Sequence, residues 1–177
     1  MAEKLKYKVD KSGKLSNVFL PILKREFPIL KHVNILFTWR NIAKWDDDGR
    51  PTAAEARRCS NKERDLYGFD FEVNVLRDNW DGLNTFAKVR LAWHELNHCV
   101  VVVDEDGKPS KDDCGKTMIS IEPHDLIIRS FKEEVNKFGL SPVDISPSKF
   151  LYKEWKKRKK MGDKYIRRMK RYKDILD

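Results

Sequence analysis

Five consecutive residues, His94-Glu95-Leu96-Asn97-His98, combine the residue types and the spacing of a metal-assisted hydrolase. On a helix, residues four positions apart share a face, so His94 and His98 can direct ring nitrogens at one metal ion. Glu95 is offset by one position, from which its carboxylate can reach a metal-bound water. The pattern predicts a zinc site with Glu95 as general base. The alternative is a helix whose two histidines are satisfied by local hydrogen bonds.

A catalytic zinc takes three protein ligands and keeps a fourth position for water. The third ligand here could be a histidine or one of several carboxylates. The longer motif H-E-x-x-H-x-x-G-x-x-H would use Asp104, but it needs a glycine turn where this chain has Val101. Glu133 and Glu134 are chemically acceptable. His124 is favoured, because it follows a proline at the start of a predicted helix, just after a predicted hairpin.

The motif requires a helix, and the sequence predicts one over residues 83–100. Apolar residues recur there with the spacing of an amphipathic helix. Asn84 can cap the start of this helix, and Gly82 breaks the segment before it. Cys99 follows the motif directly and is interpreted as a small buried hydrophobe.

Other segments are expected to form the sheet that supports this helix. Strands are predicted over residues 33–39 and 69–76, and helices over 16–25 and 126–138. The second strand alternates, with apolar residues on one face and polar residues on the other, and it could bind an extended substrate by strand addition, as sheet edges do. A further short helix is expected at residues 52–58.

A hairpin is predicted across the turn D-E-D-G-K-P, between residues 100–103 and 117–121, with the alternative that the valines at 100–103 continue the preceding helix. Together these elements predict an α+β fold in which a small mixed sheet packs on the helix that carries the H-E-x-x-H motif.

The net charge of +9 is concentrated at the C-terminus. Residues 149–177 contain thirteen Lys or Arg and four Asp or Glu, whereas residues 1–148 contain 24 of each. This asymmetry predicts a domain over residues 1–148 and a basic helical tail over 149–177. Aromatic residues are interleaved with the cations, as in segments that bind DNA or RNA. The tail could instead be a solvated helix that packs on the body. The tentative nucleic-acid contacts are Lys156, Lys157, Arg158, Lys159, Lys160, Arg167 and Arg168.

The composition also indicates in which cellular compartment the protein is expected. Three cysteines in 177 residues do not indicate a disulfide framework. There is no apolar run of membrane-spanning length and no signal-peptide pattern at the N-terminus. A cytoplasmic protein without a membrane partner is therefore expected.

The order of these segments resembles the phage metallopeptidase family and, more distantly, the SprT-type proteases. The matching segments are I-L-F-T-W-R, F-D-F-E-V-N-V, W-H-E-L-N-H-C, D-E-D-G-K-P and P-H-D, within roughly residues 16–140. The resemblance implies a zincin-like fold encoded by a bacteriophage. It also implies zinc held by His94, His98 and His124, with Glu95 as the base.

The leading hypothesis is therefore a small zinc-dependent peptidase that acts on a protein or peptide substrate, in the host cytoplasm if a phage encodes it. By residue type alone, Tyr67 and Asn97 are candidates to stabilise the oxyanion. The rival hypothesis is a nucleic-acid-binding protein whose zincin core is structural or vestigial. The two are compatible, as a protease that associates with DNA.

Overall fold

A computed structural model describes residues 6–45, 51–123 and Lys137. The chain divides into two compact units, residues 1–122 and 123–177, and the elements below all belong to the first. In chain order they are β1 (Tyr7–Val9), α1 (Ser16–Glu26), the 3-10 helix η1 (Pro28–His32), β2 (Ile35–Arg40), β3 (Ala54–Arg58), α2 (Asn61–Tyr67), β4 (Phe71–Leu76), α3 (Arg77–Gly82), α4 (Thr85–His98), β5 (Cys99–Val101) and β6 (Ile119–Ile121).

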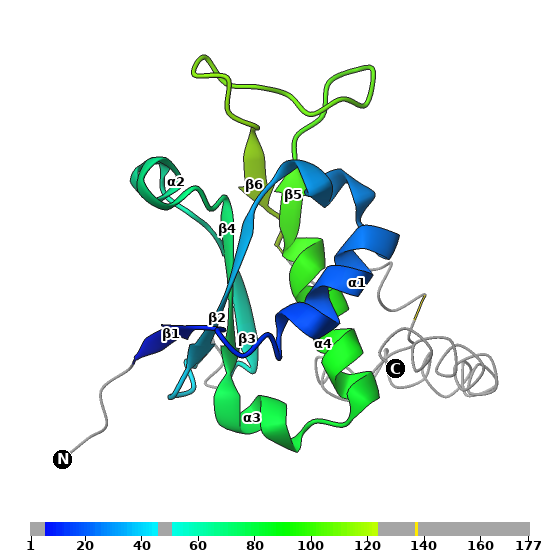
Figure 1. Ribbon diagram of the computed structural model, residues 1–177. Helices are drawn as coiled ribbons and strands as arrows, with labels where there is room; N and C mark the ends of the chain where they lie inside the picture. Colours follow the sequence, from blue (N-terminus) through cyan, green and yellow to red (C-terminus); the bar gives the residue numbers. More distant parts are fainter. Residues whose placement is uncertain (1–5, 46–50, 124–136, 138–177) are drawn as a thin grey trace, which may run out of the picture. The chain divides into compact units, whose positions relative to one another are not determined.

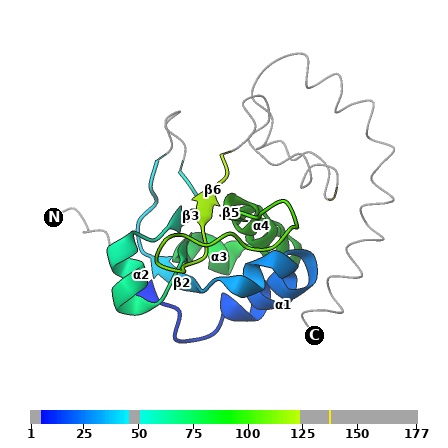
Figure 2. The same ribbon diagram turned by 90° about the horizontal axis from the view of Figure 1, so that it is seen from above.

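Four strands form a mixed sheet in the order β1-β2-β4-β3. The pair β2–β4 is parallel, and the pairs β1–β2 and β3–β4 are antiparallel. Figures 1 and 2 show α1 and α4 together on one side of this sheet. The prediction of a small mixed sheet with several helices is confirmed. The predicted helix over 126–138, the tail and the boundary at 148/149 lie outside the described residues, and the boundary stays a prediction.

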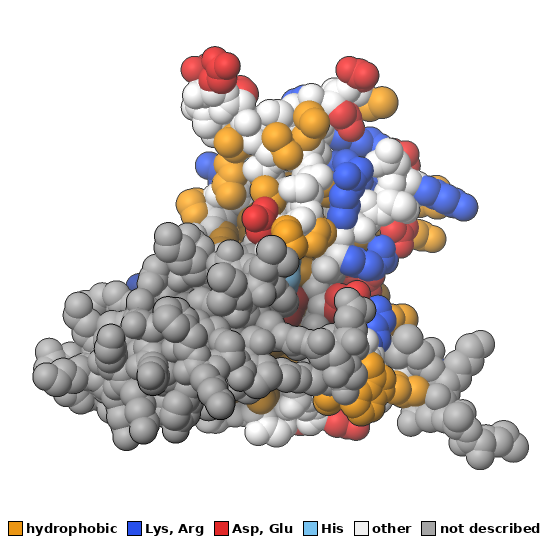
Figure 3. All heavy atoms as spheres, turned by 180° about the vertical axis from the view of Figure 1, so that it is seen from behind, with side chains coloured by type: hydrophobic (Ala, Val, Ile, Leu, Met, Phe, Trp, Pro, Cys, Tyr) orange, Lys and Arg blue, Asp and Glu red, His pale blue; other side chains and the backbone are white. Residues whose placement is uncertain are grey.

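The predicted hairpin is confirmed as the antiparallel pair β5–β6, which begins where α4 ends. Figure 3 shows hydrophobic side chains gathered over this pair, with Lys and Arg side chains beside them over β3 and α2. Val103 and Met118 are exposed at its far end. No described helix is long and apolar enough to cross a membrane.

The core lies between the sheet and the helices α1, α3 and α4. Phe19 of α1 is fully buried, and its ring centroid lies 4.9 Å from that of Phe37 in β2. Trp39 of β2 meets Trp80 of α3 edge-on, with centroids 6.1 Å apart. Burial of each such aromatic side chain stabilises the fold by roughly 2–3 kcal/mol. These contacts hold α1 and α3 against the sheet, and the ring of Phe27, at the end of α1, lies 5.2 Å from that of Trp93 in α4.

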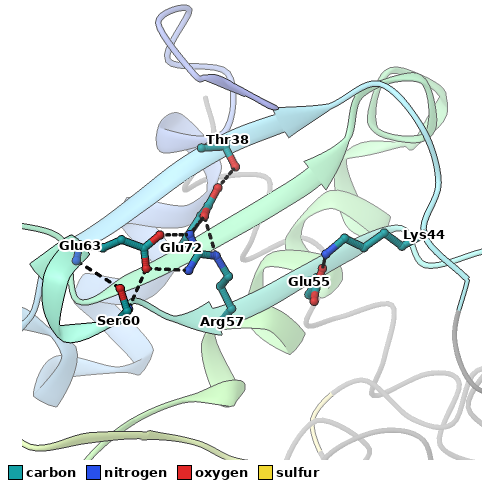
Figure 4. Close-up of polar contacts among 7 residues, drawn as sticks. All are labelled: Thr38, Lys44, Glu55, Arg57, Ser60, Glu63 and Glu72. Atoms are coloured by element: carbon teal, nitrogen blue, oxygen red, sulfur yellow. Dashed lines mark hydrogen bonds and ion pairs between the residues drawn. The ribbon is translucent and has the colours of Figure 1, made fainter. Parts of the chain in front are cut away.

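The expectation that residues 69–76 act as a sheet edge is wrong. β4 is an inner strand, and Glu72 and Asn74 are buried along with its apolar residues. Thr38 donates its hydroxyl to Glu72 at 2.7 Å, and Arg57 donates Nε to the same carboxylate at 2.7 Å. Figure 4 shows this network, which also includes Glu63. Polar alternation can therefore mark a buried polar layer, because paired and hydrogen-bonded charges tolerate burial.

The helix predicted at residues 52–58 is also wrong, because β3 occupies this segment and α2 follows it. Ala, Glu and Arg favour helices, but pairing with β4 along the whole segment overrides that preference. α2 begins with a capping box, in which Ser60 and Glu63 each bond the other's backbone N–H. Gly68, with φ +72°, ends the helix.

Candidate metal centre

The motif occupies the last turn of α4, as predicted. Asn84 caps the start of the helix, where its side chain accepts a hydrogen bond from the backbone N–H of Ala87 at 2.9 Å. The helix ends at His98, and Cys99 is already extended. The motif therefore lies where α4 gives way to β5, so the following chain can fold back toward it.

The two histidine rings have a separation that suits a shared metal ion. The ring centroids of His94 and His98 lie 5.2 Å apart, with 79° between the ring planes. A zinc ion about 2.1 Å from each ligating nitrogen, with a tetrahedral angle between them, would hold two imidazole centres about 5 Å apart. Both histidines are partly exposed, whereas Glu95 between them is buried with 3% of its surface accessible.

A backbone carbonyl fixes the orientation of the His98 ring. Nδ1 of His98 lies 2.6 Å from the carbonyl oxygen of Glu122, so the protonated Nδ1 donates there. In that tautomer the lone pair is on Nε2, the nitrogen that would face a metal. The N–H of Glu122 also donates to the His98 carbonyl at 2.9 Å. The residue that follows β6 therefore supplies the partner that orients this imidazole.

The described residues do not contain a complete set of three candidate metal ligands. Within them, no group of three His, Cys, Asp or Glu side chains could hold a metal ion. Asp104 is at a turn, where its Oδ1 accepts from the N–H groups of Asp106 and Lys108 at 3.0 and 2.8 Å. Asp104 remains a disfavoured ligand by prediction alone. His124, which was the favoured third ligand, lies outside the described residues.

Arg40 is a charged neighbour of Glu95 that sequence analysis missed. Only 1% of its surface is exposed, and its Nη2 donates to Oγ1 of Thr52 at 2.7 Å. Burial lowers the pKa of Arg40, and the negative charge of Glu55 and, more weakly, of Glu95 opposes this change. A buried cation at the end of β2 was not predictable, because an arginine after an apolar strand normally signals the surface.

Three further residues that the sequence singled out are among the described residues. The Cys99 thiol is buried, which raises its pKa, and it donates to the Glu95 carbonyl at 3.6 Å. Cys99 is therefore a small buried hydrophobe, as interpreted. Asn97 donates its side-chain amide to the Trp93 carbonyl at 2.7 Å, within its own helix. Tyr67 is 66% exposed on α2, which lies across the sheet from α4. Neither suits the oxyanion role.

The free edge of the sheet near α4 belongs to β3, and not to the strand over 69–76 that was predicted to bind substrate. Leu76 donates its N–H to the Ala53 carbonyl, and Cys59 donates to the Asp70 carbonyl. Because hydrogen-bonded pairs alternate in an antiparallel ladder, residues 54, 56 and 58 point their backbone groups away from β4. Among the described residues, no strand is paired with this outward side of β3.

Comparison with known protein families shows to which family this chain belongs. Residues 9–158 match the model of the family described as Putative phage metallopeptidase. The chain belongs to this family. The match covers both histidines of the motif, Glu95, the strands β2, β3 and β4 and the predicted third ligand His124. No curated protein and no solved structure matches this chain.

Proposed function

We propose that this chain is a zinc-dependent peptidase with a zincin-like arrangement of sheet, motif helix and metal. The bond between His98 Nδ1 and the Glu122 carbonyl is the observation that carries the proposal. A histidine that only stabilised the fold would not need Nε2 turned toward a partly exposed site. A carbonyl on Nδ1 is the usual device by which proteins orient a metal-binding imidazole.

His124 completes the site in this proposal. It lies two residues after Glu122, whose backbone is hydrogen-bonded to His98 on both sides. Each residue extends a chain by at most about 3.6 Å, so the two Cα atoms at 122 and 124 are within roughly 7 Å of each other. The proximity along the chain to a residue that contacts His98 favours His124 over the carboxylates further on. Glu133 and Glu134 have no such tether.

Bound at these histidines, zinc would lower the pKa of a water ligand toward ~7 and polarise a peptide carbonyl. Glu95 would take the proton from that water and pass it to the leaving amine. Its burial shields the carboxylate from bulk water, and the positive charge of Arg40 lies within electrostatic reach. His98, oriented by Glu122, would hold its position while the proton moves.

The substrate would bind as an additional strand on β3. The outward backbone groups of Ala54 and Ala56 can pair with a peptide, and the two small side chains face α4. Their size lets a peptide lie close to the helix that carries the motif. Main-chain pairing of this kind would favour extended or unfolded segments of protein substrates.

The deciding experiment combines metal analysis with turnover of an unfolded protein such as casein. The wild-type chain should contain about one zinc per chain and cleave the substrate. Glu95→Gln keeps the shape of the side chain and removes the base, so it should retain zinc and lose activity by two or more powers of ten, the scale of general-base loss. Unchanged turnover in Glu95→Gln would remove Glu95 from the mechanism.

We also propose that the basic tail binds DNA or RNA, because one observation favours it specifically. The whole net positive charge lies in residues 149–177, and the family match ends at residue 158, inside this run. Most of the tail is therefore an addition to the part of the chain that the family shares. A polycation with interleaved aromatic residues has the chemistry to contact phosphates and stack on bases.

A further inference from the structure

Arg58, the last residue of β3, is an exposed cation with no carboxylate partner among the residues that the structure describes. Its neighbours differ in this respect. Arg57 is paired with Glu63, and Arg64 is paired with Asp70. The one hydrogen bond of the Arg58 side chain is a long one, 3.5 Å from Nη1 to the Ile119 carbonyl of β6. Most of its donors are therefore available to a ligand.

Arg58 lies where two free strand edges approach each other. On β3 the outward backbone groups belong to residues 54, 56 and 58. On β6 they belong to Ile119 and Ile121, because Met118 accepts from Val102 and Glu122 donates to His98 across the β5–β6 pair. The contact between Arg58 and the Ile119 carbonyl joins the two edges at one end. An extended peptide on β3 would pass this guanidinium.

Arg58 and His98 both contact the segment that contains β6, at residues three positions apart. Arg58 contacts Ile119, and Glu122, which orients His98, is three residues further along. A strand rises about 3.3 Å per residue, so the Cα atoms of Ile119 and Glu122 are roughly 10 Å apart. A peptide cleaved at the metal would therefore bring a side chain about three positions from its scissile bond to Arg58.

We propose that Arg58 is a specificity-determining residue that binds a carboxylate of an extended peptide, about three positions from the scissile bond. The proposal rests on the proposed peptidase function. The carboxylate is an acidic side chain or the free C-terminus of a short peptide, because both present the planar pair of oxygens that a guanidinium fork matches. Figure 3 shows the setting, in which cationic side chains over β3 adjoin hydrophobic ones over β5–β6.

The test uses quenched fluorescent peptides of one neutral sequence, in which a single Glu or Gln is placed at each of the four positions on either side of the cleaved bond. Each peptide is made with a free and with an amidated C-terminus, which separates the two sources of carboxylate. At one position, wild-type protein should cleave the Glu peptide about 5–10 times faster in kcat/KM than the Gln peptide, the scale of one charge-assisted pair at a surface. The difference should lie in KM.

Two variants identify the residue. Arg58→Gln should reduce the Glu-to-Gln ratio to about one and leave turnover of the Gln peptides unchanged. Lys62→Gln removes a nearby exposed cation of α2 and should keep the ratio. Thermal unfolding of both variants shows whether either change acts through the fold. A wild-type ratio near one at every position, with free and amidated ends alike, or an unchanged ratio in Arg58→Gln, would overturn the proposal and leave the peptidase function standing.

Binding separates this proposal from the proposed function. The affinity of the same labelled peptides for the Glu95→Gln protein, measured by fluorescence anisotropy, does not depend on turnover. If no peptide is cleaved but the Glu peptide binds 5–10 times more tightly than the Gln peptide and Arg58→Gln abolishes the difference, Arg58 binds the carboxylate and the peptidase function is wrong. Equal binding of both peptides would reject the role of Arg58.

Discussion

At the scale of single residues, the candidate site depends on backbone groups as much as on side chains. The His98 ring is held by the carbonyl of Glu122, whose side chain plays no part in the contact. Every residue has a backbone carbonyl, so no sequence motif can identify which residue supplies this partner. Orientation of an imidazole through Nδ1 selects which nitrogen is left for a metal. The oriented His98 ring is the strongest structural sign of metal binding.

The third ligand can be tested by metal affinity. Removal of a zinc ligand should cost more than the 10- to 100-fold loss that is typical of residues around the ligands. We therefore expect His124→Ala to weaken zinc binding by at least about a hundredfold, measured by competition with a chelator. His32→Ala is the matched control, because His32 is exposed on η1 and should leave the affinity unchanged. Wild-type affinity in His124→Ala would move the ligand to Glu133 or Glu134.

At the scale of elements, β3 has two distinct sides in its hydrogen bonding. The residues at 53, 55, 57 and 59 bond to β4, and those at 54, 56 and 58 direct their backbone groups outward. A proline can therefore remove an outward donor without removing a bond of the sheet. The proposed substrate-binding edge can be tested separately from the fold in this way.

We expect Ala56→Pro to fold and bind zinc, and to raise KM for peptides about fivefold, the scale of one lost hydrogen bond. Glu55→Pro is the matched control on the adjacent residue. It removes a donor to β4 and should destabilise the protein in thermal unfolding. If Ala56→Pro cleaved peptides with an unchanged KM, substrate would not pair with β3 at this residue.

The network that joins β3 to α2 gives a prediction about pH. The two hydrogen bonds from Arg57, together with those at the start of α2, lower the pKa of Glu63 from 4.5 to about 2. A carboxylate with a lowered folded-state pKa contributes stability above its unfolded value, and this contribution is lost as the pH falls toward the folded value. The stability that depends on Glu63 should therefore disappear between pH 4.5 and about 2.

Denaturant unfolding of wild type and Glu63→Gln at a series of pH values measures this contribution. The two curves should differ at neutral pH and converge below about pH 2. The difference should stay below about 1 kcal/mol, because 32% of the Glu63 side chain is exposed and solvent screens the pair. Glu105→Gln, at an exposed turn, is the control. A constant difference from pH 7 to 2 would show that Glu63 acts through packing alone.

At the scale of the whole molecule, charge and the proposed chemistry occupy different parts of the chain. Removal of residues 149–177 eliminates the entire net charge and none of the proposed zinc ligands. We expect the shortened protein to fold, to retain zinc and to lose binding to DNA or RNA. Binding by the intact protein should fall steeply with salt, because each phosphate contact releases about one counterion.

A titration of both proteins with a labelled oligonucleotide at two salt concentrations checks this prediction. Equal binding by the shortened protein would exclude the tail as the nucleic-acid contact. Loss of the folded state on truncation, seen by circular dichroism, would instead support the alternative in which apolar residues of the tail pack on the body.

The sequence by itself determined those features that depend on short-range spacing. His94, Glu95 and His98 predicted a metal site because a helix places residues four apart on one face. The cap at Asn84 and the hairpin followed from local chemistry in the same way, and the structure confirms both, together with a small mixed sheet and several helices.

Only the tertiary structure decided the features that depend on which segments meet. Residues 54–58 have the composition of a helix and form a strand, because β4 supplies hydrogen-bond partners that the local sequence cannot reveal. Glu72 alternates like a surface residue and is buried, because Arg57 and Thr38 neutralise and bond it from neighbouring strands. The same reason applies to Arg40 near Glu95 and to the Glu122 carbonyl beside His98. Contacts between residues distant in sequence leave no signal in local spacing.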